Sequence, residues 1–279
     1  MLKRLRKQQP ILYSIFAEGL FLGLMLAASF LMVLALKLTG RDPHAVDDYL
    51  IGSVQEGIGV LVAVFLLART GRLWVLRRRG CGFMNGLLVG MYPLTLIGYT
   101  AFITMAARPD LPLKPLGEIL TFFLNMTLVG IAEETLFRGV IAQTLLEHYG
   151  TSGAGIWKAC ILSGVLFGAA HLSNLAGAAA FGVLMQSIFA AALGTLFAAI
   201  YFRTGNLWVV AFLHAAMDIV SMLIGGLYGT VTIAESVSSY DASLLMSMAV
   251  YLIPTIFLLR RSKLHEVKLY CNVKSKREK

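Results

Sequence analysis

The stretch Glu133-Glu134-Thr135-Leu136-Phe137-Arg138-Gly139 lies inside an apolar run over about 116–146. An ionisable side chain at the centre of a membrane helix costs about 2.5–3.5 kcal/mol, so such residues usually face a polar interior and serve a function. On a helix, Glu134 and Arg138 are four residues apart and lie on one face as a favourable pair. Glu133 is rotated by about 100° from that face. We therefore expect Arg138 to hold Glu134, and Glu133 to be free to act on another group.

The composition around this stretch is that of a membrane protein. The chain is 58% hydrophobic and only 14% charged, unlike a soluble globular domain. Several apolar runs reach the roughly 20 residues that cross a bilayer as a helix. The sequence therefore predicts an all-α, polytopic transmembrane bundle, a multi-pass integral protein of the plasma membrane.

We expect about eight spans. The first apolar run is about twice the 7–15 residues of a signal-peptide core, so we interpret it as a retained helix. The predicted spans cover approximately 11–38, 49–67, 82–106, 116–146, 157–172, 176–202, 207–227 and 243–259. The residues after them, 260–279, are polar and basic, and we expect a mobile tail.

The formal charge of +9 does not indicate nucleic acid, because the basic residues cluster in short segments beside the apolar runs. With eight spans, 19 of the 24 Lys and Arg residues fall on the side of the two termini and four on the other side, while Arg138 lies within a span. Basic segments of this kind remain in the cytoplasm, next to anionic lipid headgroups. We therefore predict cytoplasmic termini, membrane lipids as neighbours and no nucleic-acid partner.

Three further polar residues lie within predicted spans: His171 in the fifth, and His214 and Asp218 in the seventh. His214 and Asp218 are four apart and share a helix face. From the predicted cytoplasmic ends, a rise of about 1.5 Å per residue puts Glu133, His171 and Asp218 at about 20 Å and His214 at about 13 Å. These depths allow one common site, for which we expect a polar cavity that opens toward the cytoplasm.

Structural roles remain alternatives for individual residues. Either histidine alone is equally explained as a hydrogen-bonded packing residue, and Glu134 with Arg138 as a purely structural pair. Glu18 and Glu56 also lie within predicted spans without a matched partner in the sequence. We assign these two to helix contacts.

Together the motifs resemble the CPBP intramembrane proteases, the family of the CAAX prenyl proteases type 2 and the bacteriocin-processing Abi proteins. The matching motifs are Glu133-Glu134-Thr135-Leu136-Phe137-Arg138, Phe167-Gly168-Ala169-Ala170-His171 and His214-Ala215-Ala216-Met217-Asp218. The third motif ends in Asp where the eukaryotic-type proteases usually have Asn. The resemblance divides the chain into N-terminal helices without a motif (1–115), a catalytic helical core (116–227), and a last span with a basic tail (228–279).

The resemblance implies hydrolysis of a peptide bond in a membrane-associated peptide or protein. Glu133 and His171 would activate water, and His214 with Asp218 would stabilise the oxyanion, while Glu134 and Arg138 complete the catalytic set. An ionised Asp218 would repel an oxyanion, so this residue must be protonated or must orient His214.

Metal dependence stays open at this point. The family is often described as metalloproteases, and Glu133, His171, His214 and Asp218 are residue types that bind zinc. The sequence has no His-Glu-x-x-His helix, and a metal-free glutamate mechanism has been proposed for the family. We slightly favour the metal-free mechanism.

Two other classes of function fit the same residues. A non-catalytic immunity or scaffolding protein would bind a membrane peptide without cutting it. A proton-coupled transporter would use the acidic and imidazole groups as a relay. The transporter is disfavoured, because the chain lacks paired interrupted helices in two matching halves.

Overall fold

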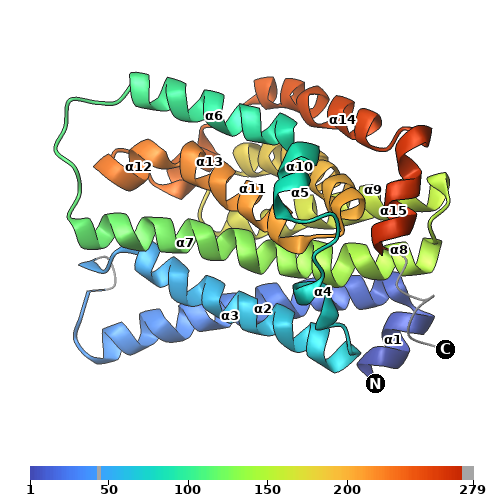
Figure 1. Ribbon diagram of the computed structural model, residues 1–279. Coiled ribbons are helices and arrows are strands. Elements are labelled where there is room, and N and C mark those ends of the chain that lie inside the picture. The colour runs from blue at the N-terminus through green and yellow to red at the C-terminus, as the bar shows by residue number, and fades with distance from the viewer. Residues whose placement is uncertain (43–44, 272–279) are drawn as a thin grey trace.

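The computed structural model describes residues 1–42 and 45–271, and this part of the chain is helical without strands (Figure 1). The all-α prediction is confirmed. The first half contains α1 (Leu2–Gln8), α2 (Pro10–Leu38), α3 (Asp48–Thr70), α4 (Trp74–Arg77), α5 (Phe83–Val89), α6 (Met91–Ala106), α7 (Leu116–Glu134) and the π-helix η2 (Thr135–Ala142). The second half contains α8 (Gln143–Tyr149), α9 (Gly153–Ala170), η3 (His171–Ala176), α10 (Ala180–Thr204), α11 (Leu207–Ser221), α12 (Leu223–Tyr228), α13 (Ile233–Ser238), η4 (Ala242–Leu245), α14 (Met246–Leu258), η5 (Arg261–Lys263) and α15 (Leu264–Cys271).

Each of the eight predicted apolar segments is helical. Within the described residues, five helices are long and apolar enough to cross a membrane, and seven spans result if each of two bent helix pairs counts as one. The remaining predicted span corresponds to α11, which has 15 residues and is short for a crossing. The chain is thus an integral membrane protein, whereas eight crossings stay a prediction.

The third predicted span is broken into α5 and α6, which meet at an angle of 80°. Pro93 has no N–H group with which to continue the hydrogen bonding of the helix onto the carbonyl of Val89. Gly90 stands at the break, where a Cβ atom would lie 2.5 Å from the Cδ1 atom of Leu213 in α11. A bend at this place therefore lets the backbone approach α11.

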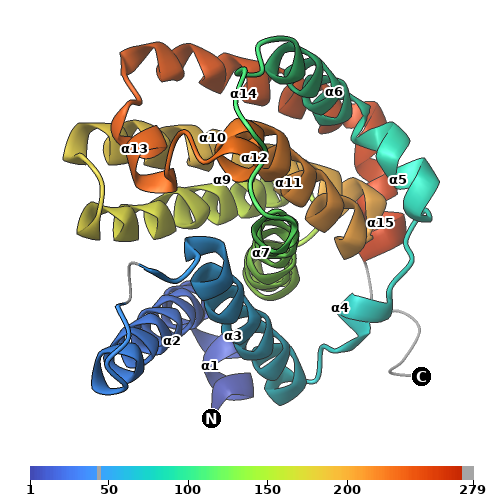
Figure 2. The same ribbon diagram turned by 90° about the vertical axis from the view of Figure 1, so that its left-hand side faces the viewer.

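The centre of the bundle is α10, which is surrounded by α9, α11, α13 and α14 (Figure 2). Within its most apolar window 72% of the residues are buried, against 11% in α2. Its contact with α9 is close because of two glycines: a Cβ at Gly164 would lie 2.5 Å from the carbonyl oxygen of Ala191, and one at Gly168 would lie 2.3 Å from that of Ser187. Small residues at this spacing let membrane helices approach closely. The end of α9, which precedes His171, is thereby fixed against α10.

The N-terminal helices share the same hydrophobic core: α2 and α3 pack against α7 and η2. Arg72, in one of the basic segments that follow an apolar run, is buried and donates 2.7 Å to Thr144 and 2.8 Å to Glu147. Arg78 reaches the carbonyl of Gly205 and the hydroxyl of Tyr201. These two arginines therefore join the N-terminal half to the motif-bearing half.

Part of the predicted mobile tail is ordered. The helix α15 packs against α10 with Val267 and Cys271 buried, and Arg203 donates to Glu266 at 2.9 Å. The expectation of a mobile tail was wrong for this segment, because its apolar face completes the core. The remainder of the predicted tail, 272–279, lies outside the described residues.

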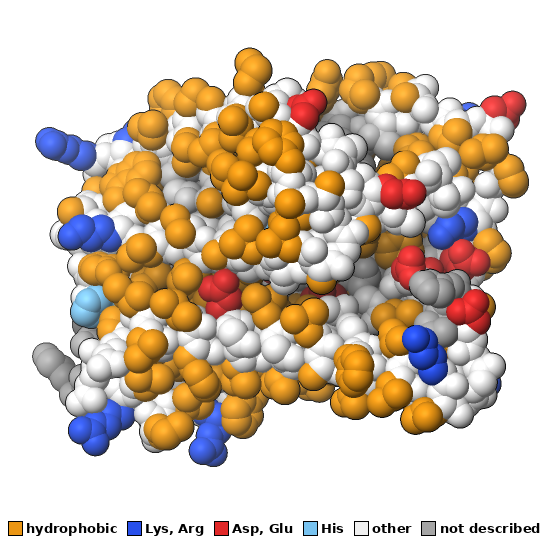
Figure 3. All heavy atoms as spheres, turned by 180° about the vertical axis from the view of Figure 1, so that it is seen from behind, with side chains coloured by type: hydrophobic (Ala, Val, Ile, Leu, Met, Phe, Trp, Pro, Cys, Tyr) orange, Lys and Arg blue, Asp and Glu red, His pale blue; other side chains and the backbone are white. Residues whose placement is uncertain are grey.

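The outer surface is apolar. Large side chains on several outward faces, among them Phe30, Leu61 and Phe102, are exposed. Figure 3 shows one face of the molecule that is largely covered by hydrophobic side chains and hollowed across its middle. Such an apolar surface is unusual for a soluble monomer and fits contact with lipid.

Candidate active site

The first motif lies at a change of helix type. Glu133 and Glu134 end α7, and the chain then continues as the π-helix η2. Single π-turns within α-helices are rare overall, but those that occur are often found at functional sites. Side chains from neighbouring segments satisfy carbonyls of η2: Ser163 donates to the carbonyl of Phe137 at 3.2 Å, and Thr144 to that of Val140 at 2.6 Å.

Glu134 and Arg138 form the predicted pair, which is confirmed. The Nη1 atom of Arg138 lies 3.0 Å from Oε1 of Glu134, and both side chains are 0% exposed. The Nη2 atom of Arg138 donates to the carbonyl of Gly194 in α10 at 3.1 Å, and its guanidinium lies 4.7 Å from the ring centre of Phe167. A fully buried ion pair with these further contacts is rigid, because either charge alone would be costly to bury.

His214 links this pair to the other acidic residues. Its Nδ1 atom lies 2.8 Å from Oε1 of Glu134. Its Nε2 atom lies 3.7 Å from Oε2 of Glu133 and 3.4 Å from Oδ2 of Asp218. One imidazole therefore contacts the buried glutamate through one nitrogen and the two accessible carboxylates through the other.

Local structure explains the placement of His214. Gly205 ends α10 in the left-handed region with φ 60°, and Asn206 caps α11 by accepting from the N–H of Trp208. The helix α11 then packs closely on α7 at Gly130, where a Cβ atom would lie 2.7 Å from the carbonyl oxygen of Ala211. This contact brings His214 to the end of α7.

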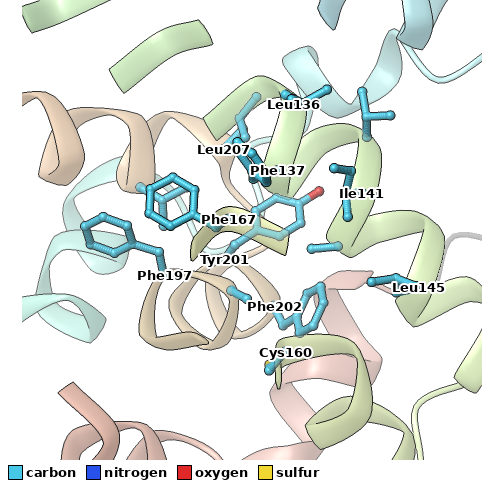
Figure 4. Close-up of a cluster of buried hydrophobic side chains, with 14 of the residues drawn as sticks. Leu136, Phe137, Ile141, Leu145, Cys160, Phe167, Phe197, Tyr201, Phe202 and Leu207 are labelled. Carbon is cyan, nitrogen blue, oxygen red and sulfur yellow. The ribbon is translucent and has the colours of Figure 1, made fainter. Parts of the chain in front are cut away.

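Aromatic rings enclose the imidazole. The ring centre of His214 lies 5.7 Å from that of Phe167 and 5.5 Å from that of Phe197. Figure 4 shows these two phenylalanines within the buried cluster that also contains Phe137 and Tyr201. The cluster leaves little free space beside the ring, so the orientation of His214 is set by packing as well as by Glu134.

His171 begins η3, directly after α9. Its Nδ1 atom lies 2.8 Å from the carbonyl oxygen of Phe167, a group that only accepts hydrogen bonds. Nδ1 therefore carries the proton, and Nε2 is the other ring nitrogen. Among the described residues, no hydrogen bond or ion pair joins His171 to Glu133.

The four residues expected to act on the substrate line one cavity of about 360 Å³. Glu133, His171, His214 and Asp218 all line it, whereas Glu134 and Arg138 lie behind its wall. The helices therefore bring the three motifs together as the depths along the spans predicted. Their catalytic roles stay predictions.

The cavity has one further acidic residue, Glu56 of α3. We assigned this residue to a helix contact, and the structure adds that it lines the cavity. The sequence signal was a glutamate in an apolar run without a partner, the same signal that directed attention to Glu133. Glu56 was assigned to a helix contact because it has no matched partner in the sequence.

The four metal-ligand candidates do not form a metal site in this arrangement. Among the described residues, no group of three or more His, Cys, Asp and Glu side chains has the geometry to hold a metal ion. The Nδ1 atoms of both histidines are engaged, by Glu134 and by the carbonyl of Phe167, which leaves only the Nε2 atoms to contact a ligand.

Comparison with known families agrees with this geometry. Residues 115–220 match the family model described as Rce1-like, type II CAAX prenyl endopeptidase Rce1-like. No curated protein matches the chain. The CAAX protease match contains all three motifs and ends before α12, while Glu56 lies outside it.

Proposed function

We propose that the protein is an intramembrane endopeptidase that hydrolyses a peptide bond in a membrane-associated peptide or protein. The observation that carries this proposal is the accessible carboxylate of Glu133 beside a histidine that Glu134 and Arg138 hold from behind. The match to a family of endopeptidases supports the same reaction class.

In this mechanism Glu133 is the general base. Its Oε2 atom has no hydrogen-bond partner among the described residues, and its side chain lines the cavity. A water molecule between Glu133 and the peptide carbonyl gives its proton to the carboxylate as its oxygen attacks the carbonyl carbon. His171 orients this water, because protonation at Nδ1 leaves the lone pair of Nε2 as an acceptor.

His214 stabilises the tetrahedral intermediate. A doubly protonated imidazole donates from Nδ1 to Glu134 and from Nε2 to the oxyanion. Donors fixed in advance are effective in a site with few waters, because they need no reorganisation during the reaction. Asp218, 3.4 Å from Nε2, acts as a positioning residue for the His214 ring.

The last step of the reaction needs only the proton that Glu133 holds. The carbon–nitrogen bond breaks as the intermediate collapses, and the proton held by Glu133 passes to the leaving nitrogen. The products are a new carboxylate and a new amine, so one water is consumed for each bond cut.

The test is incubation of the purified protein, in lipid nanodiscs, with a library of apolar peptides in ¹⁸O-labelled water. Mass spectrometry should find new carboxyl termini that carry one ¹⁸O atom each. Intact peptides that nevertheless bind the folded protein would contradict the endopeptidase and favour the scaffolding alternative.

A further inference from the structure

Glu56 is an unpaired acid in the wall of the candidate active site. It lines the cavity with Glu133, and its Oε2 atom is buried without a hydrogen-bond partner. It forms no hydrogen bond or ion pair with any residue that the structure describes. A buried polar atom without a partner is costly, which suggests that something outside the chain satisfies it.

The packing of α3 on α7 sets its position. The two helices run in the same direction, since Asp47 at the start of α3 accepts from Thr121 near the start of α7, and Arg72 just after α3 reaches Thr144 in α8. They approach each other at Gly52, where a Cβ atom would lie 2.7 Å from Nδ2 of Asn125.

Glu56 is four residues beyond this contact and Glu133 is eight residues beyond it. At about 1.5 Å per residue, the two carboxylates therefore differ by about 6 Å along the helix axes. One extended peptide residue spans about 3.3 Å, so Glu56 stands roughly two substrate residues from the group that activates water.

The charges of the cavity point to one kind of ligand. Its ionisable lining consists of the carboxyl groups of Glu56, Glu133 and Asp218, two imidazoles and the phenol of Tyr240. No Lys or Arg is among the lining residues that the structure describes. At Glu56, a carboxylate without a Lys or Arg partner attracts a cation, more strongly where water is scarce.

We propose that Glu56 is a specificity-determining residue that binds a basic side chain of the substrate about two residues from the bond that is cut. The position of the cut bond rests on the proposed function, whereas the preference for binding a basic side chain does not depend on it. The substrate class is an internal peptide bond near Lys or Arg. A free C-terminal carboxylate at the same place would face the carboxyl group of Glu56, and no Lys or Arg lines the cavity among the described residues.

The test uses an apolar 20-residue peptide series in which one Lys occupies each position in turn, and a matched series with norleucine at the same positions. Affinity is measured with the protein in nanodiscs, and kcat/KM where cleavage occurs. At one position the wild type should prefer Lys by about tenfold or more, as close charge pairs do at interfaces. Glu56→Gln should remove that preference.

Glu18→Gln is the matched control. Glu18 is also a buried glutamate with an unpartnered Oε2 atom, in the adjacent helix α2, but it does not line the cavity. This variant should keep the wild-type ratio of Lys to norleucine affinity. A merely structural role of Glu56 would lower both affinities equally and leave the ratio unchanged.

The outcomes separate the two proposals. Peptides that bind with the Lys preference, yet are never cut, would contradict the endopeptidase and support the role of Glu56. Cleavage without any Lys preference, or with a preference that survives Glu56→Gln, would overturn the role of Glu56 and leave the endopeptidase standing.

Discussion

At the scale of single residues, the site is a chain of contacts that ends at His214. Arg138 neutralises Glu134 inside the protein, and Glu134 fixes one nitrogen of His214. The other nitrogen meets Glu133 and Asp218 at the cavity. Two adjacent glutamates thus have different surroundings: Glu134 is fully enclosed, whereas the side chain of Glu133 is 21% exposed.

Glu133, the more exposed of the two adjacent glutamates, is the expected general base. Glu133→Gln should lower kcat by about 10²- to 10⁴-fold, because a positioned general base contributes that much. The fold should be preserved, since the amide has nearly the same shape. The measurement is turnover of a cleaved peptide, together with the melting temperature in detergent.

The control for this substitution is Glu118→Gln, on the same helix but with its partly exposed side chain paired to Lys114. It should keep the wild-type rate. Normal turnover in folded Glu133→Gln protein would refute the assignment of the base.

The enclosed pair should matter for stability. Arg138→Ala breaks a fully buried ion pair and leaves Glu134 with His214 as its remaining partner, and loss of one partner of such a pair costs about 3–5 kcal/mol. The melting temperature should fall clearly, and activity should fall with it because His214 loses its support. Lys114→Ala removes a partly exposed partner of Glu118 and should cost at most about 1 kcal/mol.

A double variant checks the cause. If the loss in Arg138→Ala comes from the stranded carboxylate, adding Glu134→Gln should restore part of the stability. Equal melting temperatures for Arg138→Ala and the wild type would mean that the ion pair contributes nothing measurable.

At the scale of helices, the contact between α7 and α11 holds the two halves of the site together. Gly130→Ala places a Cβ atom 2.7 Å from backbone atoms of α11, which must move away. Overpacking of this kind costs about 1–3 kcal/mol, and His214 moves with its helix. We expect lower stability and a fall in kcat, measured on the same peptide as above.

Gly117→Ala is the matched control, because this glycine is in the same helix and a Cβ there meets nothing within 4 Å. The stability and kcat of this variant should both stay near the wild-type values. A fully active Gly130→Ala protein would show that the spacing of α7 and α11 tolerates more change than the close contact indicates.

The helices also show what the sequence could predict. The apolar runs were sufficient to predict the helices. The positions of Glu133, His171 and Asp218 along their spans were sufficient to predict one common cavity. Both predictions depend on local periodicity. The π-helix after Glu134 has no such pattern in the sequence. It depends on side chains from another helix, such as Ser163, that donate to its carbonyl groups. Glu56 was missed for the same reason: only the packing of α3 brings it to the cavity.

At the scale of the whole molecule, the cavity and the basic residues lie toward opposite ends. In Figure 1, α1, α8 and α15 lie at one end, and α12 and α13 lie at the other. The cavity is lined by η3, α13 and Tyr240, but by no residue of α1, α8 or α15. The predicted cytoplasmic termini and the predicted cytoplasmic opening therefore conflict.

The basic residues decide which expectation to keep. Most of the Lys and Arg residues belong to the segments around α1, α4 and α15, and such segments remain in the cytoplasm. We therefore predict that the cavity opens toward the non-cytoplasmic side of the membrane. A substrate would then reach Glu133 from that side, as an exported or outward-facing peptide segment.

Cysteine labelling in intact cells tests this orientation. Cys81, Cys160 and Cys271 are free thiols and are replaced first. A single Cys at Ser236, in α13 beside the cavity, should react with a membrane-impermeant thiol reagent added outside the cells. A single Cys at the exposed Ser262, in η5 at the basic end, should react only after the membrane is permeabilised. The reverse pattern would place the cavity on the cytoplasmic side and the basic segments outside, against the charge distribution. The reaction proposed for Glu133 would be unaffected, but the substrate would then have to come from the cytoplasm.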